Sequence, residues 1–124
     1  RRGFAERGFS FGHLDGLLDR IREGAVQSVV VLHDEEFSSA RELETLRQIL
    51  IEASFSVALE PIPSEISEWA SARLPVATYL EESDFVVNHE GRMRRYQKAL
   101  EPPRGIQPAA TWLRALRQAM LSDR

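Results

Sequence analysis

The chain has 124 residues, 43% of them apolar and 28% charged, which suffices for one domain with a core of its own. Its formal net charge of -3 argues against binding to nucleic acid or to an anionic membrane surface, since both normally require a basic excess. It contains no cysteine, which excludes disulfides, thiolate nucleophiles and iron–sulfur ligation within these residues, and no apolar run approaches the ~20 residues that insert across a bilayer.

The first half of the chain alternates helix and strand signals. Residues 1–9 show no periodicity, so we expect a loose lead-in, and no apolar block follows their charges as in a signal peptide. An amphipathic helix that ends at Gly24 is predicted by apolar residues at helical spacing: Leu14, Leu17, Leu18 and Ile21. The run from Val26 to Leu32 is nearly all apolar, as in a parallel strand covered on both faces.

The same order then repeats. Ser39 and Glu42 form a capping box that opens a second helix, whose predicted buried side consists of Leu43, Leu46, Leu50 and Ala53. Apolar and small residues alternate from Phe55 to Leu59, which predicts a strand that Pro61 and Pro63 end. Helix, strand, helix, strand is the order of parallel strands joined by right-handed crossovers.

The second half predicts shorter elements. Ser64 caps a short helix expected over residues 64–72. A third apolar run begins at Phe85, and residues 92–96 return as its antiparallel partner after a turn at 88–91, where Gly91 is expected to adopt a positive φ. A last helix is expected from Pro108 to about Leu121. The sequence therefore predicts a single α/β domain, with a mostly parallel sheet flanked by helices and a C-terminal hairpin and helix.

The segment LPVATYLEESDFVVNHEGRMRRYQKALEPP, residues 74–103, has an order of residue types too particular for generic core packing. It resembles the molybdopterin oxidoreductase family, and within it most closely the large iron–sulfur subunit of bacterial respiratory NADH:quinone oxidoreductase. The matching residues are Ala70, Leu74, Pro75, Ala77, Thr78, Leu80, Glu81, Asn88, Glu90, Gly91, Arg92, Ala99, Leu100, Pro102, Pro103, Pro108 and Trp112, with Tyr79 in place of Phe. The departures are Asp84-Phe85 in place of Gly-Thr, Arg94 in place of Gln, and residues 71–73.

The turn after the first predicted strand bears on cofactor binding. In an open α/β sheet a phosphate binds beyond the carboxyl ends of the strands, where small residues let backbone N–H groups approach it. Here that turn is His33-Asp34-Glu35-Glu36, without glycine and with three carboxylates that would repel a pyrophosphate. The family's molybdenum enzymes hold Gly, Asn and Pro there, so the resemblance implies a vestigial domain that binds no molybdopterin.

Two further carboxylates fall at family positions near the second strand. Glu60 lies where the family often has Asp, and Glu65 matches a family Glu, so each is a candidate acceptor for a guanine edge. The alternative is that they cap and solvate the following helix, and we interpret both as vestigial cofactor-binding candidates.

No catalytic or metal-binding residue is expected. Asn88, Glu90, Gly91 and Arg92 form the best retained polar set, but no nucleophile, base or metal ligand accompanies them, so we interpret them as a structural turn or a subunit contact. The three histidines lie far apart without metal-ligand spacing: His13, His33 and His89. The basic stretch near this turn is either a solvated face or a contact for an acidic partner: Arg92, Arg94, Arg95 and Lys98.

By resemblance, the chain is a fragment of a larger subunit and serves as a non-catalytic scaffold and interaction lobe. Its partners would be other lobes of that subunit and other subunits of a membrane-bound complex, in whose cytoplasmic peripheral arm the chain would lie. The parent complex passes electrons from NADH through iron–sulfur clusters, which lie outside this segment, to quinone. One alternative is a cofactor-binding lobe of a formate-dehydrogenase-like molybdenum enzyme. Another is a phospho-receiver domain, which Lys98-Ala99 fits poorly because such domains usually place Pro after a late-strand Lys.

Overall fold

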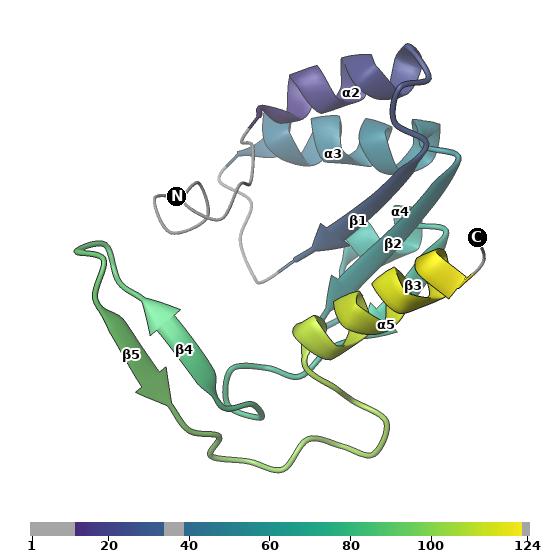
Figure 1. Ribbon diagram of the computed structural model, residues 1–124. Coiled ribbons are helices and arrows are strands. Elements are labelled where there is room, and N and C mark those ends of the chain that lie inside the picture. Colours follow the sequence, from purple (N-terminus) through teal and green to yellow (C-terminus); the bar gives the residue numbers. More distant parts are fainter. Residues whose placement is uncertain (1–11, 34–38, 123–124) are drawn as a thin grey trace.

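The computed structural model describes residues 12–33 and 39–122 (Figure 1). In chain order the elements are α2 (Leu14–Arg22), β1 (Ser28–Leu32), α3 (Ala40–Glu52), β2 (Phe55–Glu60), α4 (Glu65–Trp69), β3 (Ala72–Pro75), β4 (Asp84–Val87), β5 (Met93–Tyr96) and α5 (Ala109–Ser122). The predicted lead-in and the acidic residues Asp34, Glu35 and Glu36 lie outside the described residues.

The first three strands form a parallel sheet in the order β1-β2-β3, with β2 in the centre. The last two strands pair antiparallel as a separate two-stranded hairpin, with Val87 opposite Met93 next to the turn. The predicted fold class is therefore confirmed: a parallel sheet flanked by helices, followed by a hairpin and a C-terminal helix.

The core lies on both faces of this sheet. On one face, Val29 and Ala58 pack against α2, α3 and α4, and Ile49 of α3 is fully buried there. Neighbouring residues of a strand point to opposite faces, so Val57 and Leu59 face the other way, where they pack with Trp112 of α5. The helices α2 and α3 lie side by side, away from α5 (Figure 1).

The strand β1 is covered less fully than its sequence predicts. Val29 is buried against the helices, whereas Val30 and Leu32, on the other face, are 48% and 56% exposed. The reason is that α5 packs over β2 and β3, and β1 is an edge strand with β2 as its one neighbour in the described sheet. The expectation that both faces of this strand are covered is wrong for the described part of the chain.

The predicted helix over residues 64–72 is too long. It ends at Trp69, and Ala70 has an extended backbone, with φ -76° and ψ 148°. The chain then pairs with β2: Ser71 and Ser56 exchange hydrogen bonds in which each backbone N–H donates to the other's Oγ at 3.1 Å. This tie leads directly into β3, so pairing with a distant strand overrides the local helix signal.

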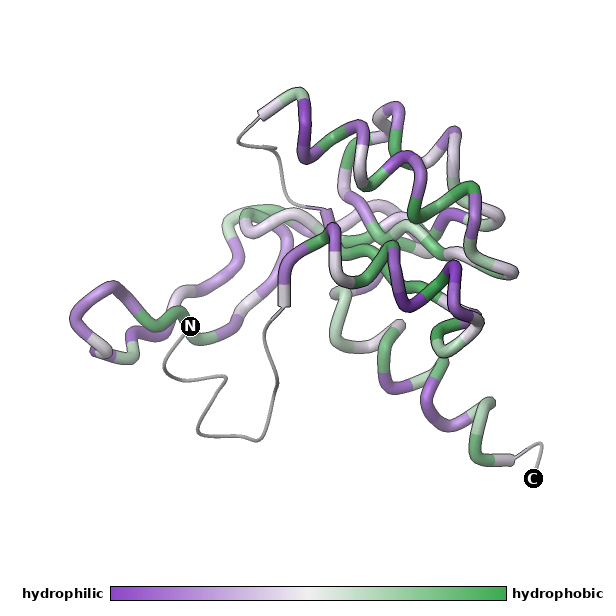
Figure 2. Tube along the Cα trace, turned by 90° about the horizontal axis from the view of Figure 1, so that it is seen from above, coloured by the Kyte–Doolittle hydropathy of each residue, from purple (hydrophilic) through white to green (hydrophobic). Residues whose placement is uncertain are grey.

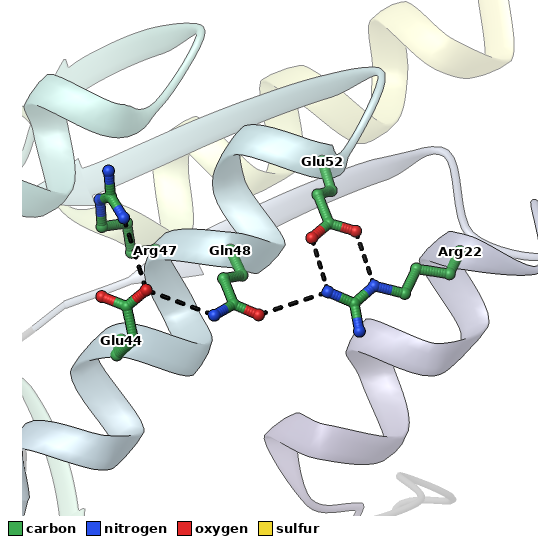
Figure 3. Close-up of polar contacts among 5 residues, drawn as sticks. All are labelled: Arg22, Glu44, Arg47, Gln48 and Glu52. Carbon is green, nitrogen blue, oxygen red and sulfur yellow. Dashed lines mark hydrogen bonds and ion pairs between the residues drawn. The ribbon is translucent and has the colours of Figure 1, made fainter.

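A polar network joins α2 to α3 on the surface (Figure 3). Arg22 donates from Nη2 and Nε to the two carboxylate oxygens of Glu52, at 2.7 and 2.8 Å, and from Nη2 to Gln48 at 3.3 Å. Both charged side chains are exposed, and ion pairs of this kind contribute little to stability. The network therefore orients the two helices, while their buried apolar faces hold them together.

Candidate functional site

The carboxyl ends of the three parallel strands meet at one edge of the sheet, which is where open α/β sheets bind ligands. A cavity of about 550 Å³ lies at this edge. It is lined by the end of β1 at Leu32 and His33, by Pro61 after β2, by residues 76–80 after β3, by Ala109 of α5, and by residues at the base of the hairpin. This edge is the first candidate site.

Trp112 fixes α5 beside the cavity. Its indole Nε1 donates to the backbone oxygen of Pro75 at 3.0 Å, across 37 residues of sequence. A bridge between Val76 and Gln107 holds the segment before α5 against the end of β3. The wall of the cavity is therefore tied to the sheet, and Trp112 acts as a packing anchor.

Glu60, the last residue of β2, is a buried carboxylate at this edge, only 4% exposed. It accepts hydrogen bonds from the Ser64 backbone N–H at 3.2 Å and from the Ser64 hydroxyl at 2.7 Å. His33 Nδ1 lies 3.3 Å from its Oε2. Ser64 in turn caps α4, because its Oγ accepts from the backbone N–H of Ile66 at 3.2 Å. Glu60 thus joins the end of β1 to the start of α4.

These contacts set the charge state of Glu60. Burial by itself raises the pKa of the carboxyl, but hydrogen bonds from the side chains of Ser67 and Ser64, the backbone of Ser64 and His33 together outweigh it. The pKa of Glu60 therefore lies below its ordinary value. The folded chain holds a carboxylate at this edge at neutral pH.

The lowered pKa of Glu60 predicts a pH dependence of stability. The unfolded chain binds this proton near pH 4.3, the folded chain only at lower pH, so the free energy of unfolding should fall as the pH drops below about 4.3. The contribution should be fully present above that pH. Urea titrations between about pH 3 and pH 6 on the native chain and on Glu60→Gln measure it. Glu60→Gln should lose less stability than the native chain between these two pH values. Equal losses in the two proteins would show that the pKa of Glu60 is not lowered by folding.

Glu65 does not share this site. It lies in the first turn of α4 and is exposed, whereas Glu60 is buried five residues earlier. Sequence reasoning paired these two carboxylates and missed that Glu60 combines with His33 and Ser64. The strand register brings the two side chains together, because Leu32 pairs with Leu59 and the residues that follow them are His33 and Glu60.

The loop from β2 to α4 offers few donors to an anion. Pro61 and Pro63 have no backbone N–H, and the N–H of Ser64 already donates to Glu60. A phosphate here would also meet the carboxylate of Glu60. The sequence of the turn after β1, residues 33–36, also argues against a bound anion, because it contains three acidic residues and no glycine. Those three acidic residues lie outside the described part of the chain.

The second candidate site is the hairpin turn, which is held from within by Asn88. Its Oδ1 accepts from the backbone N–H groups of Glu90 at 3.0 Å and Arg92 at 2.9 Å, and its backbone carbonyl accepts from the N–H of Gly91 at 3.0 Å. Gly91 has φ +82°, so the predicted positive φ is confirmed. Glu90 and Arg92 form an ion pair at 3.3 Å with side chains 51% and 71% exposed, which contributes little to stability.

Among residues 12–33 and 39–122, no three His, Cys, Asp or Glu side chains gather closely enough to hold a metal ion. No helix in those same ranges is both long and apolar enough to cross a membrane.

Comparison with known proteins identifies the class. Residues 11–118 match the molybdopterin oxidoreductase family, which is most of the chain, so the chain belongs to that family. Among individual proteins, it is 35% identical over 101 residues to one of the subunits of the NADH-quinone oxidoreductase of Streptomyces coelicolor. That match covers 81% of this chain and 12% of the relative, so the chain spans a small part of the relative's length. The resemblance seen in residues 74–103 is confirmed.

Proposed function

We propose that this chain is a non-catalytic scaffold lobe within the large iron–sulfur subunit of an NADH:quinone oxidoreductase. It has no cysteine, so any iron–sulfur cluster of the parent would be bound elsewhere. Its partners would be other lobes of the same subunit and neighbouring subunits, in a cytoplasmic peripheral arm of a membrane-bound complex. The parent would pass electrons from NADH to quinone, while this lobe performs no step of the reaction. The name of the Streptomyces coelicolor relative supports this parent.

The proposal rests on the residues found at the edge of the sheet where the carboxyl ends of the three parallel strands meet. The family's cofactor, molybdopterin with its nucleotide, is an anion that would need backbone N–H groups and cations at this edge. The edge instead presents a buried carboxylate, Glu60, whose hydrogen-bonding partners are supplied by the protein itself. Pro61 and Pro63 remove two donors from the adjoining loop. The residues present do not fit the cofactor, and the edge serves to join β1, β2 and α4.

The proposal predicts that the chain binds neither GMP nor GDP, the nucleotide portion of such a cofactor, with micromolar or tighter affinity. An affinity of that size corresponds to about -8 kcal/mol and requires a formed site. Isothermal titration calorimetry on the native chain tests this directly. The matched variant Glu60→Gln removes the repelling charge but leaves the donor-poor loop unchanged, so it should bind no better.

Micromolar binding by the native chain would contradict the scaffold role. It would favour the alternative function, a cofactor-binding lobe of a formate-dehydrogenase-like molybdenum enzyme. If Glu60→Gln bound the nucleotide and the native chain did not, the charge of Glu60, and not the lack of backbone donors, would be what prevents binding.

A further inference from the structure

The hairpin of β4 and β5 extends away from the three-stranded sheet, as two views at right angles show (Figures 1 and 2). Seven of its eight strand residues are exposed, and Tyr96 is half-buried. An isolated two-stranded hairpin is marginally stable in water and normally requires a third strand or a packed partner. The hairpin therefore has the geometry of an element that another surface covers.

The strand register divides the hairpin into two unlike faces. Residues directly opposite each other share a face, and neighbours along a strand alternate. Phe85 pairs with Arg95 and Val87 with Met93, so these four residues form one face, which we call the apolar face. Phe85, Val87 and Met93 are 57%, 52% and 59% exposed. The opposite face consists of Asp84, Val86, Arg94 and Tyr96.

The charge around the apolar face is positive on a chain whose net charge is -3. Arg95 lies on this face and forms no ion pair with any described residue, whereas Arg92 pairs with Glu90 and Lys98 with Glu101. Protein interfaces are enriched in aromatic residues, Met and Arg, and this face combines Phe85, Met93 and Arg95. A partner with carboxylates at the edge of an apolar patch would complement both the exposed side chains and the charge.

We propose that the apolar face of the hairpin is a docking surface for another subunit, whose contacting surface has an apolar centre and carboxylates opposite Arg95. This inference deepens the proposed scaffold role, on which it rests, by naming where a partner would bind. Val87 and Met93 would lie in the centre of the contact, with Arg95 at its rim. The turn held by Asn88 and Gly91 would present this face by fixing the register of the two strands.

Adjacent valines provide a matched pair for testing the surface. Val86 and Val87 are 53% and 52% exposed on the same strand but point to opposite faces. The chain has no native cysteine, so Val86→Cys or Val87→Cys introduces a single thiol into this segment. Each variant is made in the full natural polypeptide and treated with a maleimide, both in native extract and after purification. Mass spectrometry of the peptide then gives the labelling rate.

In native extract the thiol of Val87→Cys should react at least about tenfold more slowly than in the purified polypeptide, because reaction requires access to the thiolate. The thiol of Val86→Cys should react at similar rates in both. Adding Arg95→Glu to Val87→Cys should restore fast labelling, whereas adding Arg94→Glu should not. Fast labelling of Val87→Cys in extract, or equal protection of both thiols, would overturn the docking surface.

A photo-crosslinking residue at position 87 separates a protein partner from a membrane. The proposal expects crosslinks to a peptide that contains apolar residues together with Asp or Glu. Crosslinks to lipid, together with binding of the purified polypeptide to phosphatidylglycerol vesicles, would overturn it in favour of a lipid surface. The nucleotide titration reports on the scaffold role independently, so failure of either proposal is recognised separately.

Discussion

Replacing Gly91 with valine is expected to lower the free energy of unfolding by about 1–3 kcal/mol. The residue has φ +82°, a backbone conformation that β-branched side chains strongly disfavour. Apart from Gly91 and its two chain neighbours, no heavy atom of the described residues lies within 4 Å of the position that a Cβ would take, so the cost arises from the backbone conformation and not from a steric clash. Asn88 accepts from backbone N–H groups on both sides of Gly91, which prevents the turn from relaxing easily.

Gly16→Val is the matched control for this prediction. Gly16 lies within α2 and does not have a positive φ, and a Cβ at this position would meet no other described part of the chain beyond the backbone of its own helix. Valine is a better helix former than glycine, so this variant should be no less stable than the native chain. Urea denaturation measures both. An unchanged midpoint for Gly91→Val, or equal losses in the two variants, would show that the turn is not strained by a side chain.

The variant Glu60→Ala should lose about 1–3 kcal/mol of stability, because it leaves partly buried polar groups without their acceptor. The Ser64 backbone N–H and hydroxyl both lose their bond to the carboxylate, and His33 loses its neighbour at 3.3 Å. Glu65→Ala is the control, since Glu65 is exposed on the adjoining helix and its loss should change stability by about 0.5 kcal/mol at most. If the two variants had the same denaturation midpoint, the view that Glu60 connects the end of β1 to the start of α4 would be contradicted.

The elements that could be predicted from the sequence are those with strong local signals. The apolar spacing of Leu14, Leu17, Leu18 and Ile21 predicts α2, and the caps of Ser39 and Ser64 are observed, with their Oγ atoms accepting backbone N–H groups at 3.2 Å. The hairpin followed from two short strand patterns around a turn-forming segment, and Gly91 followed from its place in that turn.

The features that could not be predicted depend on contacts distant in sequence. The strand β3 exists because residues 72–75 pair with β2, whereas the local sequence predicts helix up to Ala72. The exposure of Val30 depends on where α5 packs, about 80 residues later. The cluster of Glu60 with His33 required the register of β1 against β2, and the exposure of the Glu90–Arg92 pair required the position of the hairpin outside the core.

The most direct test of the scaffold role is the turnover of NADH:quinone oxidoreductase per assembled complex when Glu60→Ala is introduced into the full subunit. A destabilised lobe should reduce the amount of assembled complex, since fewer chains stay folded long enough to be incorporated. Each complex that does assemble should transfer electrons at close to the native rate, and Glu65→Ala should resemble the native protein in both measurements. Normal assembly together with a large fall in turnover per complex would contradict the scaffold role and assign chemistry to this edge of the sheet.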